Sequence, residues 1–507
     1  MAVTFPRGGD GKRSTTATGR AIFADSVREV DPQLSDRIDQ TKDWRKGYIT
    51  PMREIVVSAA KTPQAAIAIS RAGLKSTNRR FTFTRNGEDL TLSQEMETPT
   101  ENGAIESVTV RGRASREEEF SIPYQGRRIF GVDLRRQIDK WVSTGIAEPS
   151  FGQALHLVMD NPDWLDLKDT NIAILGAGAE MAPTRSLLRW GAQIHALDLP
   201  RPEIWQRLID ITRGTPGSLR IPISPGEVGV TPFTTGGNIH SEDDSTVASV
   251  AGIDLLKQPA EVAQWINQIE GQFVLGNYAY ADGAVHALLS VSADAIFTQL
   301  AKTRQDITLA FLATPTDVFM VPMECVNASR ARWKDRGFAG ALQSPLRVFG
   351  QFEPNYPTTY FADDGTELGL SDSLVVQQGP NYLLAKRIQR WRALVARHDG
   401  FPVSLNLAPA TRTQSVVKNR ALAAAYAGAG RFGVEVFEPA TSTALMAAML
   451  VHDLRNPLST ANPSTPLANP MDLFVVGANH GGLWRSAYAP RSVLGIAAVL
   501  GMFESRA

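Results

Sequence analysis

The feature that most constrains the fold is an alternation of short apolar runs with helix-length amphipathic segments, which begins near Gly152. Runs that are apolar almost throughout are typical of parallel strands buried on both faces, and the helical segments between them supply the crossovers. The pattern predicts an α/β fold built on one doubly wound parallel sheet. Its six strands are expected at Asn171–Leu175, Gln193–Leu197, Leu219–Ile223, Gln272–Leu275, Ile307–Ala313 and Pro402–Leu407.

The part of the chain before this pattern differs in composition. Residues 1–40 are polar and charged, which predicts a frayed segment. Residues 50–145 hold short strand-like runs, such as Glu54–Ser58 and Phe81–Thr84, between charged turns. A chain of 507 residues is long for one hydrophobic core. We therefore expect an N-terminal α+β module of unknown role over residues 1–150 and a larger α/β domain over residues 151–507.

Composition narrows the class of function. Lys plus Arg and Asp plus Glu both total 52, which lacks the positive excess typical of nucleic-acid-binding proteins. Cys325 is the only cysteine, so an intramolecular disulfide and a Cys-x-x-Cys metal site are excluded and a reducing compartment is indicated. The start of the chain has no apolar signal-like region, and no run approaches eighteen apolar residues. We expect a cytoplasmic protein without a membrane span, a nucleic-acid partner or a metal site.

A glycine turn follows the first predicted strand without a spacer, with glycines at Gly176 and Gly178. Glycine permits a tight turn and lets a pyrophosphate approach the backbone. The helix expected over Ala182–Trp190 would aim its free N–H groups at that anion. Strand, turn and helix in this order predict a dinucleotide-binding turn. A glycine turn that binds no ligand and a methyltransferase-like nucleotide site are the alternatives.

The second predicted strand ends on Asp198, twenty residues after Gly178. A carboxylate at this position can accept hydrogen bonds from both ribose hydroxyls and would repel a 2′-phosphate, which favours NAD over NADP. Arg201 follows three residues later, and its positive charge weakens this preference, so NADP remains an alternative cofactor.

Tyr382 and Lys386 lie in Asn381–Ala396, a segment of helical period, so their four-residue spacing puts both side chains on one face. A lysine ammonium beside a tyrosine hydroxyl favours the phenolate and lowers the pKa of the phenol, which makes tyrosine a proton donor or acceptor near neutral pH. Taken alone, the pair also fits an ordinary surface pair of helix residues.

The order of these motifs makes residues 171–455 resemble a divergent short-chain dehydrogenase/reductase, a Rossmann-type NAD(P)-binding family. The resemblance implies that Tyr382 is the general acid/base, that Lys386 lowers its pKa and anchors the nicotinamide ribose, and that Thr314 donates a hydrogen bond to the substrate carbonyl. Thr316 is a second candidate for the position of Thr314. The implied cofactor-binding residues are Gly176, Gly178, Ala182, Asp198, Asp254, Asn277, Lys386 and Pro409.

The sequence departs from the family's pattern at several positions. Ala182 stands where the family has its third glycine, and Pro409 is followed by alanine instead of glycine. No asparagine occurs in Ala281–Lys302, where Ser290 or His286 is the substitute for the family's helix-four asparagine. About sixty residues, Val318 to Gly379, separate the fifth predicted strand from the Tyr–Lys helix, and we expect an insertion that forms a substrate lid.

The leading hypothesis is an NAD(P)-dependent oxidoreductase that moves hydride between nicotinamide and a carbonyl or alcohol carbon of a small-molecule substrate. A non-catalytic Rossmann-like binding or scaffold protein is the second hypothesis, and an S-adenosylmethionine-dependent methyltransferase is the third. The resemblance also implies a homo-oligomer, which is usual for the family.

Overall fold

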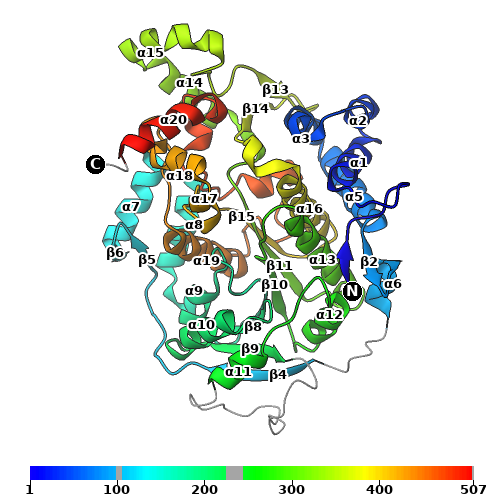
Figure 1. The fold of residues 1–507 in the computed structure, drawn as a ribbon. Helices are drawn as coiled ribbons and strands as arrows, with labels where there is room; N and C mark the ends of the chain where they lie inside the picture. Colours follow the sequence, from blue (N-terminus) through cyan, green and yellow to red (C-terminus); the bar gives the residue numbers. More distant parts are fainter. Residues whose placement is uncertain (99–104, 224–243, 505–507) are drawn as a thin grey trace.

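A computed structural model describes residues 1–98, 105–223 and 244–504 of the chain. Its centre is a seven-stranded sheet with strand order β15-β11-β10-β7-β8-β9-β4, in which only the edge strand β4 is antiparallel to its neighbour (Figure 1). The strands are β4 (Glu106–Arg111), β7 (Asn171–Leu175), β8 (Gln193–Leu197), β9 (Ser218–Ile223), β10 (Phe273–Asn277), β11 (Ile307–Ala313) and β15 (Val403–Leu407). The predicted α/β class with a mostly parallel sheet is confirmed, and all six predicted runs form strands.

The six parallel strands have the doubly wound order 3-2-1-4-5-6 when they are numbered along the chain. The order reverses between β7 and β10, which are neighbours and pair in register from Phe273 opposite Asn171 to Asn277 opposite Leu175. In open sheets of this kind, ligands bind outside the carboxyl ends of the strands at such a switch point. The topology therefore directs attention to the residues that follow β7, β8, β10 and β11.

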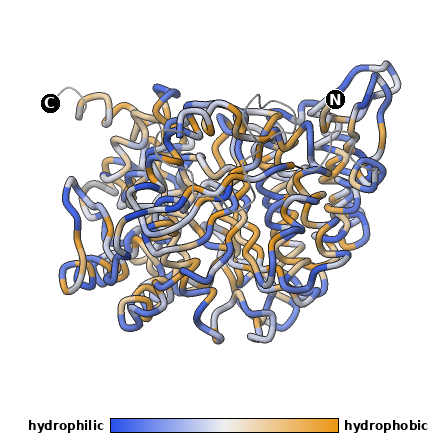
Figure 2. The backbone as a smooth tube through the Cα atoms, turned by 90° about the horizontal axis from the view of Figure 1, so that it is seen from below, coloured by the Kyte–Doolittle hydropathy of each residue, from blue (hydrophilic) through white to orange (hydrophobic). Residues whose placement is uncertain are grey.

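Both faces of the sheet are buried, because alternate residues of each strand belong to different cores. In β7, Ala173 and Leu175 join one hydrophobic cluster, whereas Ile172 and Ile174 join the other. Figure 2 shows the hydrophobic stretches running through the middle of the molecule. The first face is covered by α12 (Pro259–Asn267), α13 (Ala284–Leu300) and α16 (Gly379–His398); the second by α8 (Pro149–Asp160), α9 (Thr184–Arg189), α10 (Pro202–Arg213) and α19 (Pro439–Arg455).

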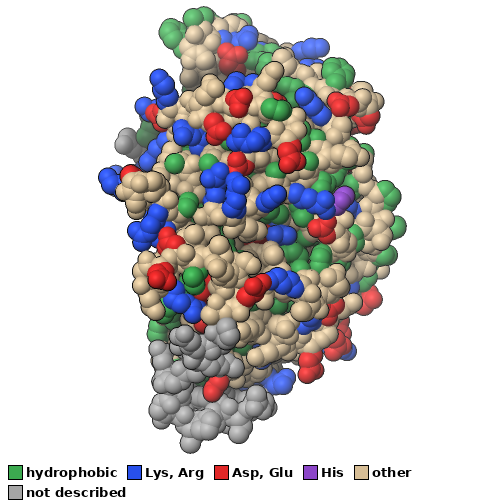
Figure 3. All heavy atoms as spheres, turned by 90° about the vertical axis from the view of Figure 1, so that its right-hand side faces the viewer, with side chains coloured by type: hydrophobic (Ala, Val, Ile, Leu, Met, Phe, Trp, Pro, Cys, Tyr) green, Lys and Arg blue, Asp and Glu red, His purple; other side chains and the backbone are tan. Residues whose placement is uncertain are grey.

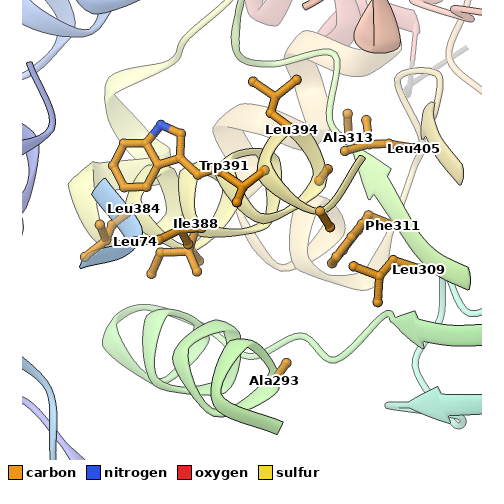
Figure 4. Close-up of a cluster of buried hydrophobic side chains, with 14 of the residues drawn as sticks. Leu74, Ala293, Leu309, Phe311, Ala313, Leu384, Ile388, Trp391, Leu394 and Leu405 are labelled. Atoms are coloured by element: carbon orange, nitrogen blue, oxygen red, sulfur yellow. The ribbon is translucent and has the colours of Figure 1, made fainter. Parts of the chain in front are cut away.

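Residues 1–97 form a layer outside α16 and α13. Trp391 of α16 packs between Leu384 and Leu394 of the same helix, and Leu74 of α5 lies beside them (Figure 4). Gly73 is required here, because a Cβ at that position would come within 2.6 Å of the Trp391 ring. The layer holds α1 (Thr15–Val27), α2 (Pro32–Asp39), α3 (Trp44–Gly47), α4 (Ile49–Ala60), α5 (Pro63–Arg80), α6 (Leu92–Glu97) and the small sheet β1 (Ala2–Thr4), β2 (Thr82–Arg85) and β3 (Glu88–Thr91).

Two predictions for this layer differ from the structure. Residues 15–39 are mostly helical instead of frayed, because their few apolar side chains, including Phe23 and Leu34, are buried together and Ser14 caps the first helix. Glu54–Ser58 lies in helix α4, not in a strand. The buried residues around it, Met52, Ile55, Val56 and Ala59, repeat with the helical period.

The remaining elements pack at the second face and around the carboxyl edge of the sheet. A hairpin and α7 precede α8. Helix α11 lies between β9 and β10 in the chain, and α17, α18 and α20 follow β15 in addition to α19. Their bounds are β5 (Ser121–Tyr124), β6 (Arg127–Phe130), α7 (Gly131–Ser143), α11 (Asp244–Val250), α17 (Gln414–Lys418), α18 (Arg420–Ala427) and α20 (Pro490–Glu504).

The predicted insertion has its own small antiparallel sheet, of order β12-β14-β13, and two helices that project from the body (Figure 1). Its elements are β12 (Val318–Pro322), α14 (Met323–Lys334), α15 (Gly337–Gln343), the 3₁₀ helix η3 (Ser344–Phe349), β13 (Thr359–Phe361) and β14 (Glu367–Asp372).

No helix in the described part of the chain combines the length and the hydropathy needed to cross a bilayer.

Candidate active site

The predicted site residues lie along the carboxyl edge of the sheet in two groups. Gly176, Gly178, Asp198 and Asp254 gather at the ends of β7 and β8. Thr314, Tyr382, Lys386 and Pro409 gather at the ends of β11 and β15, where the Ala408 N–H donates to the Ala313 carbonyl at 3.1 Å.

The glycine turn is shaped by contacts within the chain. Gly176 has a φ of +81°, and a Cβ there would come within 2.6 Å of the Ala279 backbone. The Gly178 N–H donates to Oδ2 of Asp198 at 2.7 Å, and Nη2 of Arg207 donates to the Gly178 carbonyl at 2.6 Å. Gly176 is therefore explained by the close approach of the segment after β10, and Gly178 by the Ile204 side chain of α10, which would lie 2.7 Å from a Cβ at that position.

Asp198 has a structural task in addition to the ribose contact that the family resemblance implies. Its Oδ1 accepts a hydrogen bond from the Leu199 N–H at 2.8 Å, so both carboxylate oxygens accept hydrogen bonds from backbone N–H groups. Burial raises the pKa of Asp198. A carboxylate has further lone pairs, and the Asp198 side chain is only partly buried. It can therefore still accept a hydrogen bond from a ribose hydroxyl.

The helix after the turn is shorter than predicted and starts later. It runs over Thr184–Arg189 instead of Ala182–Trp190, because Pro183 stands at its N-cap position and residues 178–182 form turns. Ala182 is buried just before the helix. The predicted start of this helix at Ala182 was therefore wrong by two residues, and its contact with a pyrophosphate stays a prediction.

Asp254 is brought beside Asp198 by the backbone. The Ile253 N–H donates to the Asp198 carbonyl at 2.9 Å, and Gly252, with a φ of +111°, packs against Pro200. Oδ1 of Asp254 accepts the Leu256 N–H at 3.0 Å. The two acidic residues thus flank the same strand end, as the resemblance implies.

The second group contains the residues with catalytic potential. Tyr382 and Lys386 lie on one face of α16, next to the end of β11. Thr314 is the threonine whose side chain acts to lower the pKa of Tyr382, and its hydroxyl lies 2.9 Å from the Thr316 hydroxyl. Thr314, not Thr316, is therefore the threonine that acts on the phenol.

The pKa of Tyr382 shifts in the direction opposite to the prediction. Burial raises it above its usual value, because the phenolate would lose its hydration. The Lys386 ammonium donates to the Leu312 carbonyl and to Oε1 of Gln389, both at 3.2 Å, and is thus directed along the helix. Burial lowers the pKa of Lys386 to about 8. Tyr382 therefore keeps its proton at neutral pH.

A polar chain that the sequence did not reveal extends inward from Lys386. Gln389 connects Lys386 to Ser290, because its Nε2 donates to the Ser290 hydroxyl at 3.2 Å. Both residues line a cavity of about 20 Å³ between the sheet, α13 and α16, which has room for about one water molecule. Asn277 lines the same cavity, and its buried Oδ1 has no hydrogen-bond partner among the described residues. The position of Gln389, three residues after Lys386, was the signal available in the sequence.

His286, the second substitute considered for the family's asparagine, packs against the tyrosine. Its ring stacks on Tyr382 with centroids 5.5 Å apart and planes 20° apart. Neither ring nitrogen has a partner among the described residues, and burial near Lys386 lowers the pKa of His286 to about 3. The neutral imidazole thus forms an apolar wall for the phenol ring.

The buried histidines predict loss of stability in mild acid. In the folded state the pKa is about 3 for His286 and about 4 for His195, against 6.5 for a free histidine. Between pH 6.5 and pH 5, each of these histidines therefore binds a proton in the unfolded state and stays neutral in the folded state. The unfolded state is therefore favoured progressively, by about 2 kcal/mol per histidine between pH 6.5 and pH 5. Urea unfolding at several pH values should show this loss, and His286→Phe should remove about half of it. An equal pH dependence in the variant would contradict the neutral state of His286.

A buried ion cluster fixes the helix that carries Tyr382 and Lys386. Asp317, just after β11, accepts hydrogen bonds from Nη2 of Arg387 and from Nη1 of Arg390. The Arg390 guanidinium lies between the rings of Phe319 and Phe474, 4.5 and 4.3 Å from their centroids. All three charged side chains are buried. This arrangement couples the position of α16 to the strand end that carries Thr314.

The fit of a nicotinamide dinucleotide differs between the two groups. Lys386 uses two of its three N–H donors on other described residues, which leaves one for a ribose hydroxyl. Thr314 and Tyr382 bring two hydroxyls together at the point where a nicotinamide would meet its substrate. Pro409 follows β15 next to them, and its carbonyl accepts from Thr411. The residues present therefore fit the nicotinamide half, whereas the Gly178 N–H is already committed to Asp198.

No family model and no curated protein matches the chain. Among solved structures, it is similar to a thiolation-reductase di-domain from an archaeal non-ribosomal peptide synthetase, with a TM-score of 0.27 and 12% sequence identity. The likeness covers 55% of this chain and 52% of that one, so the chain spans about half the length of this neighbour. A TM-score this low identifies neither a shared fold nor a shared activity.

Proposed function

We propose that the protein is an NAD(P)-dependent oxidoreductase of the short-chain dehydrogenase/reductase type that reduces a carbonyl group of a small molecule. The observation that carries the proposal is the meeting of Thr314, Tyr382 and Lys386 at the carboxyl end of β11 in a doubly wound sheet. The resemblance of residues 171–455 to this family supports the same conclusion.

The chemistry follows from the state of each side chain. A bound nicotinamide dinucleotide would supply the hydride that reduces the carbonyl carbon. Thr314 donates a hydrogen bond to the carbonyl oxygen and holds it beside Tyr382. Tyr382 gives its phenolic proton to that oxygen as negative charge develops there. Lys386 binds the ribose and its positive charge stabilises the resulting phenolate.

The direction of reaction is supported by the pKa of Tyr382. Because burial raises this pKa, the free enzyme holds the phenol protonated at neutral pH and is prepared to donate. Reduction of a carbonyl needs a proton donor, whereas oxidation of an alcohol needs the phenolate. A protonated Tyr382 is therefore the form that carbonyl reduction requires.

The proposal leaves the nucleotide as NAD or NADP. Asp198 favours NAD, and the positive charges of Arg201 and Arg207 near its carboxylate favour NADP. A binding or scaffold protein would have no use for Tyr382 and Thr314 hydroxyls at the strand end. A methyltransferase of this fold class would use the same glycine turn, so cofactor identity has to be tested directly.

Titration of the full chain with NADH and NADPH, followed by nucleotide fluorescence, tests the proposal. We expect saturable binding of at least one of them and no competition by S-adenosylmethionine. Asp198→Asn should weaken NADH binding by about tenfold and NADPH binding by less, because it removes the charged acceptor of the ribose hydroxyls and also the charge that repels a 2′-phosphate. Glu203→Gln, an exposed charge change on α10, is the matched control and should have no effect.

Two results would contradict the proposal. Absence of saturable binding of either dinucleotide would exclude the oxidoreductase, and binding of S-adenosylmethionine alone would favour the methyltransferase. An equal loss of NADH and NADPH binding in Asp198→Asn would instead show that the carboxylate acts on the turn and not on the ribose.

A further inference from the structure

The projecting end of the insertion carries a cluster of exposed hydrophobic side chains. Twenty large hydrophobic side chains are exposed in the described part of the chain, and five of them lie within residues 338–349. We call these five the apolar tip: Phe338, Leu342, Leu346, Val348 and Phe349. Three are exposed by more than three-quarters, with Phe338 at 79%, Val348 at 86% and Phe349 at 76%. Single exposed hydrophobic residues are normal on a protein surface, but a contiguous group marks an interaction site.

The tip belongs to a lobe formed by α15 and η3, which stands out from the body at the top of Figure 1. Figure 3, turned about the vertical axis, again shows hydrophobic side chains at the top of the molecule. The apolar tip is therefore convex and does not line a groove.

Basic residues lie on both sides of the apolar tip along the chain. Arg330 and Lys334 are exposed and lie one turn apart on one face of α14, and Arg347 is exposed within η3, where its guanidinium lies 3.4 Å from a Glu353 oxygen. We call these three the basic collar. Asp335 is the only acidic residue in 330–349, so this stretch carries a clear positive excess in a chain whose total charge is zero.

Other contacts anchor α14, the helix that precedes the lobe, to the body. Arg332 donates to the carbonyls of Arg485 and Thr144, at 2.8 and 2.6 Å, and the Tyr488 hydroxyl donates to Oε1 of Gln343 in α15 at 2.8 Å. Trp333 at the end of α14 packs against a small cluster that contains Phe352 and Tyr488. The exposed tip is thus carried by an anchored element and is not a loose loop.

We propose that this lobe attaches the protein to the surface of an anionic lipid bilayer. The apolar tip would enter the boundary between headgroups and acyl chains, and the basic collar would contact the negatively charged headgroups. An apolar tip with basic residues on either side of it in the chain is complementary to a soft, negatively charged layer. Attachment of this kind is peripheral, because the lobe contacts the bilayer whereas the carboxyl edge of the sheet belongs to the body of the protein.

A second copy of the chain fits the lobe less well. A two-fold contact places the same patch against itself, so the basic collars of the two copies would be brought together. Like charges facing one another across an interface oppose association. The charge of the collar therefore argues for a negatively charged occupant.

The test is flotation of the full chain with lipid vesicles. Vesicles of phosphatidylcholine with about one-third phosphatidylserine should bind the protein, and vesicles of phosphatidylcholine alone should bind it much more weakly. Each basic side chain near an anionic surface contributes about fivefold to binding, so Arg330→Glu with Lys334→Glu should lower binding by more than tenfold. Raising the salt concentration should weaken binding in the same way.

Variants of the tip separate insertion from simple charge attraction. Phe338→Asp with Phe349→Asp should abolish binding to the anionic vesicles. Val132→Asp with Leu458→Asp, at side chains exposed by 71% and 80% outside the lobe, is the matched control and should bind like the wild-type protein. All these side chains are exposed, so the variants should fold, which circular dichroism checks.

Three outcomes would overturn the proposal. These are no binding to anionic vesicles, equal binding by the tip variant and the wild-type protein, and a dimer in analytical ultracentrifugation that Phe338→Asp with Phe349→Asp dissociates. The last outcome would assign the lobe to contact between copies of the chain.

Discussion

Replacing Tyr382 by phenylalanine is expected to lower the rate of NAD(P)H-dependent carbonyl reduction by about 10²–10⁴-fold, the usual contribution of a general acid. The substitution removes only the hydroxyl that gives the proton. The ring should stay in place, because its stacking on His286 does not involve the hydroxyl. We therefore expect the dissociation constants of NADH and NADPH to remain nearly unchanged while kcat falls.

The measurement is steady-state consumption of the reduced cofactor with the best carbonyl compound from a panel of aldehydes and ketones. Tyr124→Phe, a conservative change on β5 outside the insertion and both groups of site residues, is the control and should keep full activity. Retention of activity by Tyr382→Phe would remove this tyrosine from the chemistry.

Asp317→Ala is expected to destabilise the folded protein by about 3–5 kcal/mol, because it leaves two buried guanidinium groups without their counter-charge. Burial and the neighbouring Arg390 lower the pKa of Arg387 to about 9 even with Asp317 beside it, which shows how unfavourable its charge is in this environment. The variant should also lose activity, since Asp317 ties α16 to the end of β11.

Urea unfolding followed by circular dichroism measures the effect. Glu54→Ala is the control, because Glu54 pairs with Arg37 on the surface at 2.8 Å, where both side chains are more than two-fifths exposed. Its loss should cost less than about 1 kcal/mol. Equal costs for the two variants would show that the buried cluster contributes nothing beyond a surface pair.

The sheet could be predicted from the sequence because its signal is local. Each parallel strand is an apolar run of five to seven residues, and Asn171–Leu175, Gln193–Leu197 and Ile307–Ala313 match strands β7, β8 and β11 residue for residue. The edge strand β4 was not predicted as part of this sheet. It pairs antiparallel with β9, which lies far away in the sequence, and the residues of β4 themselves do not indicate which strand they pair with.

The helices of residues 1–80 illustrate a second limit. Polar composition suggested a frayed start, whereas the structure buries Phe23 against Trp44 and Trp391, at centroid distances of 5.8 Å each. The stabilising partner Trp391 lies more than three hundred residues away, so composition within a window could not reveal it. Local propensity decides little where tertiary packing supplies the stability.

The site was only partly visible in the sequence for a related reason. The spacing of Tyr382 and Lys386 is local and was recognised, whereas the partners that set their pKa values come from other elements. Thr314 acts on the phenol from the end of β11, and Leu312 accepts from the ammonium across the strand end. The prediction that lysine lowers the pKa of tyrosine was wrong in direction, because burial outweighs a charge directed elsewhere.

The most direct test of the proposed function is an experimental structure of the full chain with NADH or NADPH bound. We expect the nicotinamide ring to lie beside Tyr382 and Thr314 and a ribose hydroxyl to accept a hydrogen bond from Lys386. The adenosine should lie at the other end of the same edge, near Asp198 and Asp254. A dinucleotide bound away from this edge, or a Tyr382 hydroxyl out of hydrogen-bond reach of the nicotinamide site, would contradict the account.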